Sequence, residues 1–143
     1  MNFVNRRQLI VEWGHCDPAK IVFNSRYFEY ADWSTALLFE AAFGMNILEI
    51  KEKYAADMPL VDASARFIKP AMLRDVVEIA SNIDAFKRSS FVVLHRFFNR
   101  GEPVAEVQET RVWVSVDPNE PGKFKSKPIP ADVTERFKAA RNT

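Results

Sequence analysis

Hydrophobic and polar positions change their period along the chain, and the period predicts where strands and helices lie. Residues Arg7 to Trp13 alternate in polarity, which predicts a strand that ends at Gly14. From Ser25 to Phe43 there is neither glycine nor proline, and apolar residues lie on nearly every face of the predicted helix. A helix that is apolar almost all round is expected to be buried.

In the second half of the chain, apolar residues recur with the two-residue period of strands. After a shorter helix predicted at roughly Asn46 to Tyr54, alternating apolar positions predict four strands, at residues 60–67, 76–85, 91–98 and 104–116. The turn at residues 99–102 predicts that the last two strands form a hairpin. An amphipathic stretch around Val133 and Phe137 predicts a surface helix near the end of the chain.

This order of elements predicts an α+β fold in one domain that spans residues 1–143. The strands are consecutive and joined by hairpins, so they are expected to form an antiparallel sheet of about five strands wrapped around the long central helix. One face of that sheet would remain uncovered, which predicts that copies of the chain associate.

Composition narrows the classes of function. The 20 basic and 19 acidic residues leave a formal charge of +1, which argues against a nucleic-acid partner. No apolar run approaches the roughly 18 residues of a membrane span. Cys16 is the one cysteine, so no internal disulfide is expected. Residues 1–7 lack the apolar region of a signal peptide, and a cytoplasmic location is expected. Two distant histidines make a metal site unexpected.

The turn at residues 14–18 is the first candidate for chemistry, because it places Asp17 between a strand and the start of the buried helix. An aspartate in a turn often has a structural role, in which its side chain accepts hydrogen bonds from neighbouring amides. The functional alternative depends on the free N–H groups at the helix N-terminus, which stabilise negative charge. A carboxylate beside them could attack a carbonyl whose oxygen points at the amides, as in a minimal hydrolytic site.

Three other sets of polar residues are candidates for chemistry. A catalytic pair of His15 and Cys16 is rejected, because adjacent side chains in an extended segment point in opposite directions. Asp32 lies inside the predicted helix, where it either forms a salt bridge, for example with Arg66, or lines a substrate pocket. The basic turn at residues 87–90 is either a solvated hairpin tip or a site for phosphates.

The segment WGHCDPAKIVF at residues 13–23, followed by YFEYAD at residues 27–32, resembles the signature of the 4-hydroxybenzoyl-CoA thioesterase family. The order of elements is similar to the hotdog fold of that family along nearly the whole chain. The resemblance implies hydrolysis of an acyl-CoA without a cofactor, by Asp17 as nucleophile or general base. It also implies a tetramer of two dimers, with each active site shared across a dimer interface.

The resemblance implies further roles for residues around that turn. Backbone amides near Asn24 and Ser25 would polarise the thioester carbonyl. The acyl pocket would include Phe23, Asp32 and Met58. The phosphates of coenzyme A would bind the basic turn, which consists of Lys87, Arg88, Ser89 and Ser90.

Some residues of this chain depart from the family pattern, and these residues bear on the identity of the acyl group. Lys20 stands where the family often has glycine, and Asn24 and Ser25 stand where it often has an aromatic residue and proline. An aryl-CoA such as a (hydroxy)benzoyl-CoA is favoured over a fatty acyl-CoA, although Met58 weighs against a hydroxylated ring. The alternatives are a non-catalytic module that binds acyl-CoA, and a hotdog dehydratase, which typically uses a histidine where this turn offers Asp17.

Overall fold

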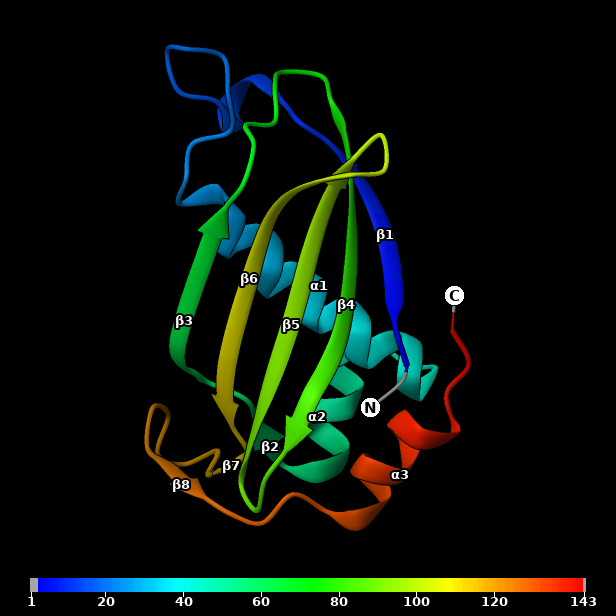
Figure 1. Cartoon of the computed structure of the whole chain (residues 1–143). Helices are drawn as coiled ribbons and strands as arrows, with labels where there is room; N and C mark the ends of the chain where they lie inside the picture. Colours follow the sequence, from blue (N-terminus) through cyan, green and yellow to red (C-terminus); the bar gives the residue numbers. More distant parts are fainter. Residues whose placement is uncertain (1–2, 143) are drawn as a thin grey trace.

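The computed structural model describes residues 3–142, in which a long helix lies across one face of a five-stranded antiparallel sheet (Figure 1). In spatial order the strands of this sheet are β1 (Asn5–Ile10), β4 (Val76–Phe86), β5 (Ser90–Asn99), β6 (Glu102–Val112) and β3 (Leu60–Phe67). A second, small sheet contains β2 (Ala56–Asp57), β7 (Val114–Val116) and β8 (Phe124–Ser126). The predicted α+β architecture is confirmed.

The helices begin and end close to the predicted positions. The central helix α1 (Arg26–Phe43) stops at Gly44, whose φ of 69° is the left-handed conformation that glycine adopts readily. The next helix, α2 (Ile47–Tyr54), is capped by Asn46, whose side chain accepts a hydrogen bond from the third residue of the helix. The predicted amphipathic helix is α3 (Ala131–Ala139).

The central helix is buried against the sheet on one side only. Tyr30, Leu38 and Phe39 of α1 are completely buried, whereas Trp33 on the other side is 45% exposed. The expectation that α1 is buried all round is therefore wrong, because a single sheet covers one side of a helix and leaves the other open. No helix within residues 3–142 is both long and apolar enough to cross a membrane.

Two predicted strands end earlier than their alternation suggests. The ladder between β1 and β4 ends at Ile10, and Trp13 lies beyond it in a short 3₁₀ helix, η1 (Trp13–His15), with 69% of its surface exposed. The predicted strand at residues 104–116 is divided into β6 and β7 at Trp113. The backbone of Trp113 donates to the Ser89 carbonyl (2.7 Å) and accepts from Lys127 (3.1 Å), so the chain leaves one sheet for the other there.

Strand β3 forms one edge of the large sheet and pairs only with β6 among the described strands. Its side chains are largely exposed on both faces, and the exposed apolar residues in and just after it are Leu60, Val61, Phe67 and Ile68. An apolar edge with free backbone groups is a typical association surface.

Candidate active site

The loop before α1 folds back on itself at Asp17. The Asp17 amide donates to the Ile21 carbonyl (2.9 Å), and the Lys20 amide donates to the Asp17 carbonyl (2.9 Å). This reversal requires a φ of 66° at Lys20, in the left-handed region where glycine is favoured. The backbone thus adopts the conformation suited to the family's glycine even though this chain has lysine.

The carboxylate of Asp17 has a structural contact and also lines a cavity. Its Oδ1 accepts a hydrogen bond from the Ala19 amide (2.8 Å), which is the structural role expected of an aspartate in a turn. Within residues 3–142, no donor lies within hydrogen-bonding distance of Oδ2. The cavity has a volume of about 370 Å³, and its other walls are Ile21, Val22, Phe23, Asn24, Tyr27, Phe67, Ile68, Lys69 and Pro70. Asp17 is therefore held at one oxygen and available at the other.

Two backbone amides directly before α1 form no hydrogen bond within residues 3–142. The first three N–H groups of α1, at residues 26–28, donate to the carbonyls of residues 23–25 at distances of 2.9–3.3 Å. In the part of the chain that the structure describes, the amides of Asn24 and Ser25 have no acceptor. Asn24 lines the same cavity as Asp17. The structure thus places Asp17 and Asn24 on one cavity, with Ser25 next to Asn24 in the chain.

His15 and Cys16 do not form a pair. The His15 ring accepts at Nδ1 from the Glu12 amide (3.2 Å), and the Cys16 thiol donates to the Glu12 carbonyl (3.5 Å). The edge of the His15 ring packs against Tyr30, with 5.2 Å between ring centroids. The Tyr30 hydroxyl is buried without a hydrogen-bond partner among the described residues, and this burial raises the pKa of Tyr30. No nucleophilic cysteine is assembled here.

Asp32 and Met58 meet through an arginine that the sequence analysis did not single out. Arg111 Nη2 donates to Asp32 Oδ1 (2.6 Å), and Arg111 Nη1 donates to the Met58 carbonyl (2.9 Å). The expected salt bridge of Asp32 is therefore present, although its partner is Arg111 and not Arg66, which was given as an example. The Met58 side chain is buried in the core, so Met58 offers its carbonyl and not its thioether to this contact.

Arg111 is in turn held by a buried carboxylate, Glu109. The guanidinium donates from Nε to Glu109 Oε1 (3.2 Å) and from Nη2 to Oε2 (2.9 Å). Glu109 Oε1 also accepts from the Thr35 hydroxyl and lies 3.2 Å from His95 Nε2. On the other side of the imidazole, Nδ1 lies 2.6 Å from the Ser81 hydroxyl. Burial alone would raise the pKa of Glu109, but hydrogen bonds from His95 and Arg111 outweigh it and lower the pKa to about 2.

A signal for this network was present in the alternation of β6. Glu109 and Arg111 have the same parity as the buried Val107 and Trp113, so both charges occupy the inward-facing side of the strand. Two opposite charges two residues apart on a buried face predict a buried ion pair.

The basic turn lies far from Asp17 in the same chain. Lys87 and Arg88 are exposed in the turn between β4 and β5, at the end of the sheet opposite to the loop that carries Asp17 (Figure 1). Between these ends runs α1, whose 18 residues span about 27 Å. The predicted phosphate site and the predicted carboxylate therefore do not meet within one chain.

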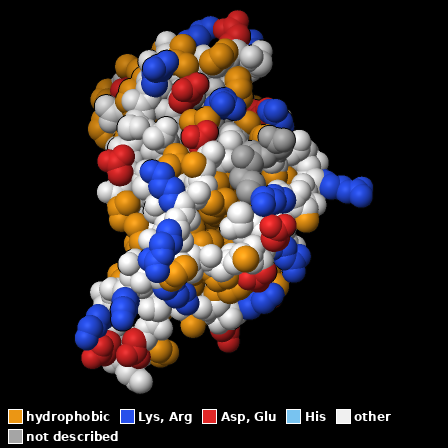
Figure 2. All heavy atoms as spheres, turned by 60° about the horizontal axis from the view of Figure 1, so that its bottom comes forward, with side chains coloured by type: hydrophobic (Ala, Val, Ile, Leu, Met, Phe, Trp, Pro, Cys, Tyr) orange, Lys and Arg blue, Asp and Glu red, His pale blue; other side chains and the backbone are white. Residues whose placement is uncertain are grey.

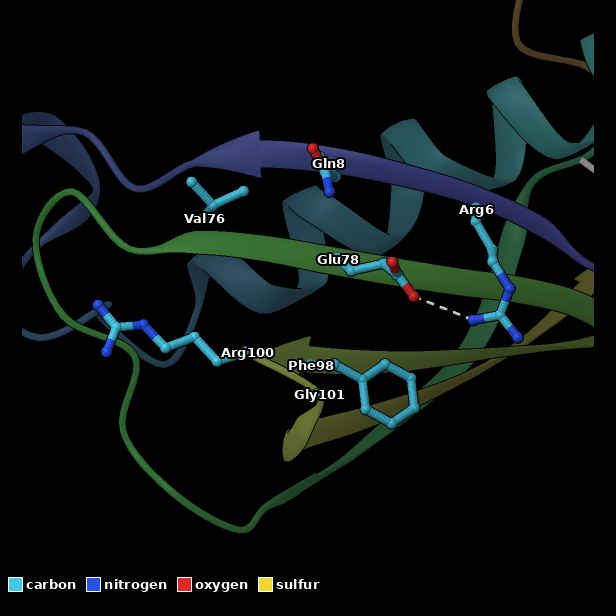
Figure 3. A pocket seen from close by; sticks show the side chains of 7 residues that line it. All are labelled: Arg6, Gln8, Val76, Glu78, Phe98, Arg100 and Gly101. Carbon is cyan, nitrogen blue, oxygen red and sulfur yellow. Dashed lines mark hydrogen bonds and ion pairs between the residues drawn. The ribbon is translucent and has the colours of Figure 1, made fainter.

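A second hollow, of about 430 Å³, lies on the sheet face opposite to α1 (Figure 3). Its acid, Glu78, is paired with Arg6 at 3.0 Å. The residues that line it are Arg6, Gln8, Val76, Glu78, Phe98, Arg100 and Gly101. It comes from strands and a hairpin turn, without the free helix amides that accompany Asp17, and we assign the chemistry to the Asp17 cavity.

Comparison with known proteins connects this arrangement to one family. The family described as "Thioesterase-like superfamily" matches residues 11–137. A 4-hydroxybenzoyl-CoA thioesterase from Pseudomonas sp. (strain CBS-3) is 29% identical over 132 residues, which cover 87% of this chain and 91% of the relative.

Solved structures agree with this assignment. A gentisyl-coenzyme A thioesterase superposes with a TM-score of 0.77 and 29% identity over 90% of this chain and 98% of the other. An aspartate-to-asparagine mutant of 4-hydroxybenzoyl CoA thioesterase, complexed with 4-hydroxybenzoyl CoA, superposes with a TM-score of 0.84 and 25% identity over 94% and 98% of the two chains. These similarities confirm the predicted hotdog fold.

The buried carboxylate generates a prediction about stability and pH. Because the pKa of Glu109 is about 2 in the folded state and about 4.3 in an unfolded chain, its contribution is fully present above about pH 4.3 and is lost as the pH falls toward 2. Glu109→Gln should lower the free energy of unfolding at pH 7 by about 3 kcal/mol, since it leaves Arg111 buried beside a neutral partner. Urea unfolding at pH 7 and pH 3 measures both effects.

The control is Glu106→Gln, an outward-facing change on the same strand, which should alter the free energy of unfolding by no more than about 0.5 kcal/mol. The difference between Glu109→Gln and the wild type should shrink at pH 3. An equal difference at both pH values would contradict the assigned pKa.

Proposed function

The chain belongs to the thioesterase-like superfamily and is a thioester hydrolase that acts on acyl-CoA, and from this premise we propose that Asp17 is its catalytic carboxylate. One observation carries the proposal. Asp17 lines the same cavity as Asn24, whose amide, like that of Ser25, has no acceptor among the described residues. The replacement of an aspartate in the relative that was complexed with 4-hydroxybenzoyl CoA also supports a role for such a residue.

In the proposed reaction, the thioester carbonyl enters the cavity with its oxygen toward the amides of Asn24 and Ser25. These N–H groups and the helix dipole stabilise the negative charge that develops on the oxygen. Asp17 either attacks the carbonyl carbon, which expels the thiolate of coenzyme A and leaves an anhydride for water to cleave, or removes a proton from the attacking water. Both routes yield the free acid and coenzyme A.

The proposed acyl group is aromatic. The cavity walls include the rings of Phe23, Tyr27 and Phe67, which offer flat apolar surfaces to an aryl ring. The names of two relatives, 4-hydroxybenzoyl-CoA thioesterase and gentisyl-coenzyme A thioesterase, describe substrates of this class. We therefore favour an aryl-CoA over a fatty acyl-CoA.

For coenzyme A, we propose a phosphate site at the basic turn. Arg88 is tied to the C-terminal segment, because its carbonyl accepts from the Ile129 amide (2.8 Å), and this segment includes β8 with its flanking lysines. Lys87, Arg88, Lys123 and Lys125 are all exposed. The face that this end presents carries a spread of Lys and Arg side chains (Figure 2). Such a surface suits the several phosphate charges of coenzyme A.

Two copies of the chain would bring the separated groups together. If β3 pairs antiparallel with β3 of a second copy, the Phe67 end of one strand lies beside the Leu60 end of the other. The Asp17 cavity lies at the Phe67 end, whereas Arg111 pairs with Leu60 at the opposite end. We propose that each active site combines the Asp17 loop of one copy with the Asp32, Arg111 and basic-turn end of its partner, in a dimer that associates further to a tetramer.

The proposed reaction uses protein groups alone. Among residues 3–142, no three His, Cys, Asp or Glu side chains are grouped so that they could hold a metal ion. The free Cys16 suits a reducing compartment, and we propose that the protein works in the cytoplasm.

Asp17→Asn should reduce kcat by at least about 100-fold, because it removes the nucleophile or base while keeping the shape of the side chain. Turnover of benzoyl-CoA, followed by thiol release, is the measurement, with a thermal melt to confirm folding. The matched control is Asp84→Asn, an exposed change on β4 that should leave kcat within about twofold. A loss of less than about tenfold in Asp17→Asn would remove Asp17 from the central role.

The double change Lys87→Ala with Arg88→Ala should raise KM for acyl-CoA about tenfold with little change in kcat, because the phosphates bind equally in the ground and transition states. The rise should shrink as salt is added, since exposed charges are screened. A control with Arg96→Ala and Arg100→Ala removes two cations elsewhere and should leave KM unchanged. An unchanged KM at low salt in the Lys87→Ala, Arg88→Ala variant would show that the turn is a solvated hairpin tip that does not bind phosphates.

Sharing of sites predicts complementation. When Asp17→Asn is refolded together with the Lys87→Ala, Arg88→Ala variant, mixed dimers contain one site with both intact halves, and activity at subsaturating substrate should approach about a quarter of the wild-type value. Activity equal to the mean of the separately refolded variants would show that each site lies within one copy. Sedimentation of the wild type at micromolar concentration as a stable 16.4 kDa species would also contradict the shared site.

A further inference from the structure

Another hollow, which we call the β1 groove, lies where the edge strand β1 passes α1, and it has a volume of about 770 Å³. Its lining comes from β1, η1, the segment at the start of β4 and the outer side of α1. None of these residues lines the Asp17 cavity. Gln8 and Val76 also line the hollow of Figure 3, so the β1 groove reaches around the open edge of the sheet. A hollow of this volume suits a small molecule.

Arg7 lines the β1 groove without an acid paired to it. Its Nη1 donates to the Ser34 hydroxyl (3.3 Å), and this completely buried hydroxyl donates in turn to the Tyr30 carbonyl (2.7 Å). The side chain is partly buried, and the burial lowers the pKa of Arg7. Within residues 3–142, no carboxylate forms an ion pair with this guanidinium, and its other N–H groups have no acceptor. A cation that is partly withdrawn from water and lacks a counter-ion favours a bound anion.

A second guanidinium lines the β1 groove just before β4. Arg74 has a φ of 72°, which is strained for a residue other than glycine, and its amide donates to the Val11 carbonyl (2.9 Å). Its side chain is exposed and forms no ion pair in the described part of the chain. Glu12 is the one acid among the described residues of the lining, and His15 accepts at Nδ1 from the Glu12 amide, which leaves Nε2 as the donor of the ring. Two guanidiniums against one carboxylate suit an anion with a single charge.

Apolar side chains form much of the remaining lining. Trp33 is 45% exposed on the outer side of α1, and its ring packs against the buried Tyr30 with 5.9 Å between ring centroids. Ile10 and Val76, which also line the β1 groove, are exposed as well. An indole that is held on one side and open on the other offers a flat surface to an aromatic ring.

We propose that the β1 groove is a binding site for an aromatic carboxylate, with the carboxylate on Arg7 and Arg74 and the ring on Trp33. A guanidinium donates two parallel hydrogen bonds to a carboxylate, which fixes the orientation of such a ligand. A phosphate dianion would bring a second negative charge toward Glu12 and fits less well. The inference rests on the proposed function only for the source of the ligand, because the free acid that the reaction releases belongs to this class.

Calorimetric titration of the whole protein with benzoate tests the proposal, beside benzamide as a neutral molecule of nearly the same shape. Benzoate should bind with a Kd on the order of 1 mM or lower, and benzamide at least about tenfold more weakly. Arg7→Met should weaken benzoate binding about tenfold, and Trp33→Ala about fivefold. The matched control is Arg96→Met, a change of an exposed arginine on β5, which should leave the Kd unchanged.

The fluorescence of Trp33 reports where benzoate binds. Trp33→Phe keeps an aromatic ring, so benzoate should still bind by calorimetry, but the change in fluorescence seen with the wild type should be lost. A fluorescence change that persists in Trp33→Phe, an unchanged Kd in Arg7→Met, equal affinity for benzamide, or no saturable binding up to about 10 mM would each overturn the proposal. If Arg7→Met fails to fold, Trp33→Ala still decides, because Trp33 is largely exposed.

Thiol release from benzoyl-CoA separates this proposal from the proposed function. Arg7→Met should keep kcat within about twofold of the wild type, because the β1 groove and the Asp17 cavity share no residue. If the wild type releases no thiol but binds benzoate through Arg7 and Trp33, the proposed function fails and the β1 groove stands. If Trp33→Ala alters sedimentation and leaves benzoate binding intact, the groove is covered by a second copy of the chain, and the proposal is overturned.

Discussion

The packing of α1 against one face of the five-stranded sheet places both halves of the proposed site. The helix begins where the Asp17 loop ends, so Asn24, whose amide has no acceptor among the described residues, lines the same cavity as that carboxylate. Further along the same helix, Asp32 and Thr35 meet Arg111 and Glu109 of β6. A shift of α1 along the sheet would move the amides and break the contacts to β6 together.

The buried pair of Glu109 and Arg111 shows what this packing has to accommodate. Moving two charges out of water is costly, and an apolar pair of similar size would often stabilise a core as well or better. The pair is tolerated because nearly every donor and acceptor around it is matched, from Ser81 through His95 to the Met58 carbonyl. Such matching fixes the orientation of the side chains as well as stabilising them, and a fixed orientation is what a binding group at the surface needs.

Local patterns in the sequence predicted the elements and the Asp17 turn, because these depend on short stretches of chain. The stop at Gly44 and the five strands follow from periodicity and turn chemistry, whereas the roles of the Asn24 and Ser25 amides were implied by the resemblance to a family. The end of β1 at Ile10, the division at Trp113 and the pairing of Asp32 with Arg111 depend on contacts between distant segments. Periodicity carries no information on such partners, although the inward parity of Glu109 and Arg111 in β6 marked them as buried.

The exposed edge at β3 affects how the activity of the enzyme depends on its own concentration in the cell. If two copies complete each site across this edge, the fraction of enzyme that is active depends on the protein concentration, because dimer formation is a binding equilibrium. On dilution below the dissociation constant of the dimer, specific activity would decline even though each chain kept its fold. The same edge, with its apolar Leu60 and Val61, would then face water and be exposed to unwanted strand pairing. The cellular concentration of the enzyme would thus determine both the fraction that is dimeric and active and the fraction whose free β3 edge can aggregate.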